Sequence, residues 1–166
     1  MLDKKGDSRL VKSNINMKKI YLVLILFASL LQSCNSDDCG ECFTPPQSFV
    51  FELVDAEIGG NLFTTDMYNP EDISVINTID NTERAFQFIS ENQLNVIQIQ
   101  EVGWETEIVN LEIKIGEDTV FSLYVNAERT TDDCCSFTKY NEIEIRNAEF
   151  ELDSQTGVYK ILVDLN

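Results

Sequence analysis

Residues 111–127 read LEIKIGEDTVFSLYVNA, and this stretch decides the fold of the domain. Apolar and polar side chains alternate through residues 111–115, and they alternate again through residues 121–127. Gly116-Glu117-Asp118 lies between the two runs and is typical of a turn. Alternation with a period of two predicts a β-strand with one buried face. The stretch therefore predicts two strands joined by a turn.

The same alternation recurs through most of the chain after residue 48, with strands every 10–15 residues and turn-like sequences between them. In residues 94–100 the apolar side switches, which indicates a bulge or a strand buried on both faces. The pattern predicts an all-β domain over residues 48–166, an antiparallel β-sandwich of about seven to nine strands. An up-and-down barrel is the alternative. The alternation places these side chains in one shared core: Phe51, Ile113, Leu123, Ile145 and Ile161.

One segment carries a family resemblance. Residues 49–55 (FVFELVD), followed by residues 59–63 (GGNLF), resemble the first hairpin of small prealbumin-like or carboxypeptidase-regulatory-like modules of bacterial lipoproteins. The resemblance implies an immunoglobulin- or prealbumin-like sandwich. The resemblance identifies no catalytic residues in this chain.

Residues 17–34 read MKKIYLVLILFASLLQSC and have the organisation of a signal peptide. Two lysines precede an apolar run from Ile20 to Leu31. The run is about a dozen residues long, whereas a helix that spans a bilayer needs about 20. A basic start followed by a short apolar core is typical of an export signal.

The end of this run, Leu31-Gln32-Ser33-Cys34, resembles a lipobox, the recognition site of the lipoprotein signal peptidase. Gln32 departs from the small or branched residue that is usual at its position. The resemblance implies cleavage before Cys34 and lipidation of the Cys34 thiol and amine. Several acyl chains anchor a protein stably, because each buried CH₂ contributes about 0.8 kcal/mol.

These features divide the chain into three parts. Residues 1–33 are the predicted signal peptide, in which residues 1–16 fit an over-extended start before Met17; residues 34–47 are the lipid anchor and an acidic tether. Asn35-Ser36-Asp37-Asp38 resembles the surface-export tether of Bacteroidetes lipoproteins, and an ordinary flexible linker is the alternative. The whole chain resembles small Flavobacterium-type surface lipoproteins, which implies an outer-membrane address with exposure on the cell surface as an option.

The charge is unevenly distributed. Six of the 12 basic residues but only two of the 29 acidic residues precede Cys34, so the remainder carries 6 basic and 27 acidic side chains, a net charge of −21. Such a surface repels phosphate backbones, so nucleic acid is excluded as a partner. It also repels anionic lipid, so the lipid anchor must supply the attachment of the protein to the membrane.

Four cysteines remain after Cys34, and an exported address favours disulfides between them. A zinc site and a redox-active Cys39-Gly40-Glu41-Cys42 motif are the alternatives. Two prolines follow that motif and oppose the helix that a redox motif would open, whereas Cys134 and Cys135 are adjacent and poorly suited to share one metal. We expect Cys39 and Cys42 to be bridged to Cys134 and Cys135, in one of two pairings.

The chain contains no histidine, which removes Ser-His-Asp and Cys-His catalysis and imidazole metal sites. Calcium is a candidate cofactor because acidic loops supply oxygen ligands; the loops are residues 66–72, 80–83 and 132–133. The single tryptophan, Trp104, is a candidate ligand contact, and the alternative is that it closes one end of the sandwich.

The sequence thus predicts a membrane-anchored lipoprotein whose β-domain binds or scaffolds rather than catalyses, with an envelope protein or a glycan as the candidate partner. A hydrolase that uses carboxylates, of the glycosidase kind, is the alternative from another class. A calcium-stabilised adhesion module is the third hypothesis.

Overall fold

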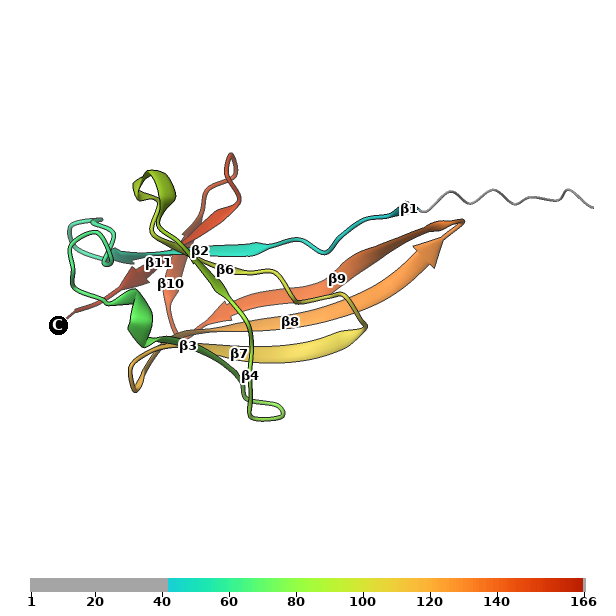
Figure 1. The fold of residues 1–166 in the computed structure, drawn as a ribbon, viewed down its shortest axis with the longest axis horizontal. Coiled ribbons are helices and arrows are strands. Elements are labelled where there is room, and N and C mark those ends of the chain that lie inside the picture. The colour runs from blue at the N-terminus through green and yellow to red at the C-terminus, as the bar shows by residue number, and fades with distance from the viewer. Residues whose placement is uncertain (1–41, 166) are drawn as a thin grey trace, which may run out of the picture. The chain divides into compact units, whose positions relative to one another are not determined.

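The computed structural model describes residues 42–165, which form an all-β domain (Figure 1). The signal peptide, Cys34 and Cys39 lie outside the described residues. Eleven strands and two short 3₁₀ turns make up the described part, at these positions: β1 Cys42–Phe43, β2 Phe49–Asp55, η1 Pro70–Asp72, β3 Ile73–Asn77, β4 Thr82–Glu83, β5 Gln87–Ile89, η2 Glu91–Gln93, β6 Val96–Ile99, β7 Glu107–Ile115, β8 Asp118–Asp132, β9 Cys135–Arg146, β10 Glu149–Leu152 and β11 Val158–Val163.

The strands form two sheets. The six-stranded sheet has the order β1-β9-β8-β7-β3-β4, and the five-stranded sheet has the order β10-β11-β2-β6-β5. The all-β, two-sheet prediction is confirmed. Two details of it are wrong: the described residues form eleven strands rather than seven to nine, and both sheets are mixed, because β2 pairs with β11 and β1 pairs with β9 in parallel.

The inner faces of the two sheets share one hydrophobic core. Phe51 of the five-stranded sheet and Phe121 of the six-stranded sheet are both fully buried, and their ring centroids lie 4.8 Å apart. Of the five predicted core residues, Phe51, Ile113, Leu123 and Ile161 are buried, and Ile145 packs half-buried against the same cluster. Ile145 is less covered because β9 lies near the edge of its sheet.

Strand β8 is the longest element, and it runs the length of the domain. It pairs with β7 over its first part and with β9 over most of its length, and β-bulges interrupt both ladders. Figure 1 shows the end of β8 and the start of β9 extending beyond the five-stranded sheet as an arm, and β1 pairs with β9 there. A 15-residue strand is about 45–50 Å long, so the two ends of β8 are far apart.

Strand β1 belongs to the segment that the sequence analysis assigned to the tether. Cys42 pairs in register with Cys135 at the start of β9, and a disulfide joins the two residues. Beyond β1, the Thr44 N–H donates to the Ser136 carbonyl and the Gln47 N–H donates to the Tyr140 hydroxyl. The chain is therefore held on the arm from Cys42 to the first core strand.

Candidate functional site

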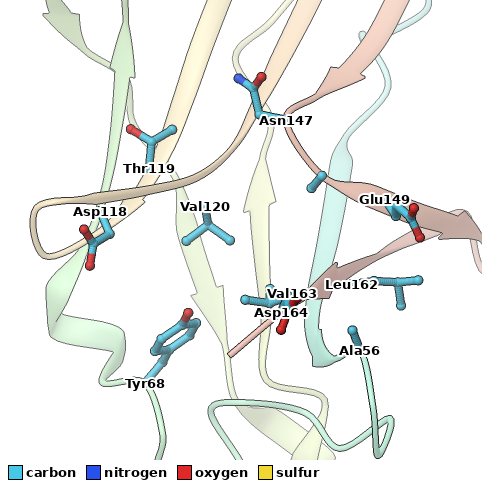
Figure 2. A pocket seen from close by; sticks show the side chains of 11 residues that line it. Ala56, Tyr68, Asp118, Thr119, Val120, Asn147, Glu149, Leu162, Val163 and Asp164 are labelled. Carbon is cyan, nitrogen blue, oxygen red and sulfur yellow. The ribbon is translucent and has the colours of Figure 1, made fainter. Parts of the chain in front are cut away.

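A cavity with a volume of about 640 Å³ lies at the end of the sandwich away from the arm (Figure 2). Drug-sized ligands occupy cavities of about 300–1,000 Å³. The walls come from five segments: the residue after β2, the loop before η1, the start of β8, the corner between β9 and β10, and the end of β11. The polar lining residues are Tyr68, Asp118, Thr119, Asn147, Glu149 and Asp164, and the apolar ones are Ala56, Val120, Ala148, Leu162 and Val163.

Tyr68 supplies a hydroxyl group on the floor of this cavity, and Figure 2 shows that hydroxyl directed into the open space. Tyr68 is fixed because its N–H donates to the Leu62 carbonyl and its ring packs against Phe63 at 6.0 Å between centroids. Burial raises the pKa of Tyr68 above its ordinary value of 10.0, and the Asp118 carboxylate raises it further. The hydroxyl therefore keeps its proton at neutral pH and is available as a donor.

Two turns hold the rim of the cavity in place. The Gly116 N–H, in the turn between β7 and β8, donates to the Asp72 carbonyl at 2.8 Å, which joins that turn to the loop that carries Tyr68. Asn147 forms the β9–β10 corner with a positive φ of 65°, and its side-chain amide donates to the buried Ser122 hydroxyl. Asparagine tolerates this left-handed conformation better than most residues.

All of the charged residues that line the cavity are acidic. Asp118, Glu149 and Asp164 line it, whereas none of its lining residues is a lysine or an arginine. All three carboxylates are solvent-exposed. The arrangement favours cationic or hydroxyl-rich groups over anions.

Trp104, the predicted ligand contact, lies beside the arm rather than at the cavity. Its side chain is 49% exposed, and it lies next to Phe43, which is 59% exposed, with 6.4 Å between ring centroids. The Arg129 guanidinium lies 5.9 Å from the centre of the indole ring. Trp104 thus does not close an end of the sandwich as a buried residue, and its ring is in contact with neighbouring side chains on the surface.

The loop that presents Trp104 is fixed by its backbone. The Gly103 N–H donates to the Glu107 carboxylate at 2.8 Å, and the Gly103 carbonyl accepts from the Thr138 hydroxyl at 2.6 Å. The Tyr140 hydroxyl donates to the Val102 carbonyl. Arg84 holds the other oxygen of Glu107 in an ion pair.

The described cysteines are oxidised. Cys42 is bonded to Cys135, with 4.6 Å between their Cα atoms. This is one of the predicted bridges between residues 39–42 and residues 134–135. Cys134 is disulfide-bonded as well. Because the bond of Cys42 runs to Cys135, Cys42 does not form the short bridge of a Cys-x-x-Cys redox motif here.

In residues 80–83, one of the three loops that were candidates for calcium, an acid is held in turn hydrogen bonds. The Asp80 carboxylate accepts from both the hydroxyl and the N–H of Thr82, and these bonds lower the pKa of Asp80 below 3.8. Between residues 42 and 165 there is no group of three or more His, Cys, Asp or Glu side chains arranged to hold a metal ion.

Sequence reasoning missed the cavity because its walls come from five separate segments. Tyr68 and Asn147 have no neighbours in the sequence that mark them as a pair. Asp118 ends the predicted turn Gly116-Glu117-Asp118, and an acid in a turn does not by itself indicate a cavity.

Comparison with protein-family models, with curated proteins and with solved structures finds no match to this chain. In the described part of the chain, no helix has the length and apolar character needed to cross a membrane.

Proposed function

We propose that the chain is an exported, lipid-anchored, non-enzymatic binding module whose ligand site lies at the end of the domain opposite the Cys42–Cys135 disulfide. The proposed address is the outer membrane, held through lipid on Cys34. The proposed architecture is a divergent immunoglobulin- or prealbumin-like sandwich with mixed sheets.

The observation that carries this proposal is the course of β8. Its last residues adjoin the Cys42–Cys135 disulfide, and its first residues, Asp118 and Thr119, line the cavity. From Cys34 to Cys42 the chain spans eight residues, or at most about 29 Å. An anchor at Cys34 would thus be at most about 29 Å of chain from Cys42, and β8 separates the disulfide from the cavity by about 45 Å.

The disulfide supports the exported address. Such bonds persist in oxidising compartments and are rare in the cytosol of most organisms. Cys42–Cys135 would also keep the first segment of the domain from peeling away from β9 under a pull from the membrane.

The exposure of the cavity carboxylates supports binding over catalysis. A carboxyl group that acts as a general acid usually lies in an apolar, buried environment that raises its pKa. Asp118, Glu149 and Asp164 are all open to solvent. Retention of a cationic or hydroxylated group by these oxygens and the Tyr68 hydroxyl is the simpler use of the cavity.

The test combines an assay for turnover with one for binding. The full-length protein, purified from membranes in detergent, should hydrolyse none of a panel of glycosides, esters and peptides. Amide chemical shifts around Tyr68 and Asp118 should move on titration with at least one amine or sugar, and Asp118→Asn should weaken the effect. Hydrolysis that Asp118→Asn or Glu149→Gln abolishes, in a protein that remains folded, would instead establish the carboxylate hydrolase.

Calcium is tested in the same preparation. A melting temperature that is unchanged by a calcium chelator is the expected result. A fall of several degrees on chelation would favour the calcium-stabilised adhesion module.

A further inference from the structure

Strand β10 is a free edge of the five-stranded sheet. It is the last strand on its side of the sheet, and all four of its residues are exposed. Its sequence alternates strictly: Glu149 and Glu151 lie on one face, and Phe150 and Leu152 lie on the other. An exposed edge strand is a ready template for one more strand.

The backbone of β10 presents hydrogen-bonding groups to the outside. The Asp153 N–H donates to the Val158 carbonyl, so this pair is a hydrogen-bonded pair of the β10–β11 ladder. Hydrogen-bonded pairs alternate along an antiparallel ladder, so Glu151 and Glu149 also bond to β11. The N–H and C=O groups of Phe150 and Leu152 therefore point away from β11. Within residues 42–165, no hydrogen bond to these four groups is observed.

The apolar face of β10 is uncovered although it belongs to the inner side of the sheet. Phe150 lies opposite the fully buried Ile161, and Leu152 lies opposite Tyr159. Despite this inward direction, Phe150 is 44% exposed and Leu152 is 52% exposed. The Phe150 ring contacts the Tyr159 ring at 6.0 Å, and Tyr159 in turn contacts the core residue Phe51 at 5.6 Å. The core thus extends to this edge and ends without a cover.

The charge around β10 decides which strand could complete it. A second copy of this chain would bring like charges together, because two β10 strands would set glutamates against glutamates on domains that are both strongly acidic. Glu149 is also a lining residue of the cavity, together with Asp118 and Asp164. A strand added along β10 would pass this acidic cavity at the Glu149 end.

We propose that β10 binds an extended peptide segment of a partner protein by strand addition, and that the segment alternates basic and apolar residues. Its backbone pairs with Phe150 and Leu152, its apolar side chains cover those two residues, and its basic side chains meet Glu149 and Glu151. A lysine or arginine at the Glu149 end enters the cavity. In strand addition of this kind the main chain supplies affinity and the pockets supply specificity.

The probe is a fluorescein-labelled peptide of strictly alternating lysine and valine, measured by fluorescence anisotropy against the full-length protein in detergent. The matched control peptide has the same composition with its lysines and valines in two separate blocks. The alternating peptide should bind at least tenfold more tightly than the blocked peptide. Equal binding of both would show general attraction to an acidic surface, and absence of binding by the alternating peptide would show no strand addition; either result overturns the proposal.

The decisive variant is Leu152→Pro, with Leu152→Ala as its matched control. Proline removes the outward N–H of residue 152 without removing a bond to β11, and edge strands tolerate proline in such positions. Leu152→Pro should weaken the alternating peptide at least tenfold, and Leu152→Ala should weaken it less than threefold. Unchanged binding by Leu152→Pro overturns the proposal.

A second measurement keeps the test valid if Leu152→Pro fails to fold. In the unmodified protein, the amide shifts of Phe150 and Leu152 should move more than those of Glu149 and Glu151 when the alternating peptide is added. Shifts confined to other strands would contradict strand addition at β10. Failure here would leave the small-ligand role of the cavity intact, because the cavity titration uses no peptide.

Discussion

Gly103 is the residue whose replacement should disturb the Trp104 loop most. It has a φ of +98°, and a Cβ atom there would lie 2.7 Å from the Thr138 methyl group. Gly103→Ala therefore combines backbone strain with a steric clash, and we expect a loss of about 2–4 kcal/mol of unfolding free energy in urea. The control is Gly116→Ala, which has φ +62° and open space around its Cβ, and it should cost only about 1 kcal/mol. Equal losses for the two variants would show that the clash is relieved at no cost.

The disulfide between Cys42 and Cys135 closes a long loop, with a sequence separation of 93 residues. The chain-entropy model gives such a bridge about 4–5 kcal/mol. Because the expected Cys39–Cys134 bridge would close almost the same loop, the test variant replaces Cys39, Cys42, Cys134 and Cys135 together by serine. It should lose several kcal/mol of unfolding free energy, measured by urea denaturation under oxidising conditions. A loss below about 1 kcal/mol would show that β1 contributes little to the folded state.

Non-reducing peptide mapping tests the second bridge. Cys134 is disulfide-bonded, and the sequence analysis leaves Cys39 as its expected partner. A peptide containing Cys39 should therefore be linked to one containing Cys134. A link from Cys134 to Cys34 would contradict both this pairing and the lipidation of Cys34.

At the scale of the strand, the alternation in β7 makes a direct prediction. Ile113 is fully buried and faces Phe121 across the β7–β8 ladder, whereas Glu112 is on the opposite face. Ile113→Ala should cost about 2–5 kcal/mol, because it removes buried methyl groups and leaves a cavity. Glu112→Ala should stay within about 0.5 kcal/mol in the same denaturation assay. Comparable costs would mean that this face assignment is wrong.

The β10–β11 turn makes a prediction about pH. The Asp153 carboxylate accepts from the Gln155 N–H and also interacts with Thr156, and these bonds lower the pKa of Asp153 below 3.8. A lowered pKa in the folded state means that the stabilisation is present above pH 3.8 and is lost as the pH falls through the folded pKa. Asp153→Asn should therefore be less stable than the unmodified protein at pH 6, and the difference in stability should be smaller at pH 3. The same stability difference at both values would contradict this assignment.

The alternation of apolar and polar side chains was sufficient to predict the strands but not which strands pair with each other. Residues 111–115 and 121–127 form β7 and β8 as expected, because alternation reports one buried face and nothing more. The parallel pairing of β2 with β11 joins residues about 110 positions apart, and no local pattern encodes it. Strand β1 was missed because two residues are too few for a periodicity, and its position depends on the Cys42–Cys135 bond.

The candidate site was less accessible to prediction than the fold. Trp104 stood out as a single tryptophan, and the structure places it on the arm between Phe43 and Arg129. The cavity depends on Tyr68, Asp118 and Asn147 meeting at one end of the sandwich, which requires the complete topology. The uncovered Phe150 and Leu152 resemble any other alternating strand in the sequence, because only the sheet order makes β10 an edge.

At the scale of the whole molecule, the two ends of β8 differ. The end of β8 adjoins the Cys42–Cys135 disulfide, and the first residues of β8 line the cavity. Figure 1 shows β10 toward the same end of the domain as the start of β8. Strong negative charge keeps such domains apart on a crowded surface and restricts partners to neutral or basic groups.

Intact mass spectrometry of the membrane-extracted protein tests most directly the proposal that the chain is exported, cut before Cys34 and held by lipid. We expect a mature chain that begins at Cys34, with the added mass of a diacylglycerol and an amide-linked acyl chain on that residue. Cys34→Ser should abolish this species and the incorporation of labelled palmitate. A chain that begins at Met1 or Met17 and carries no lipid, recovered from the soluble fraction, would contradict the account.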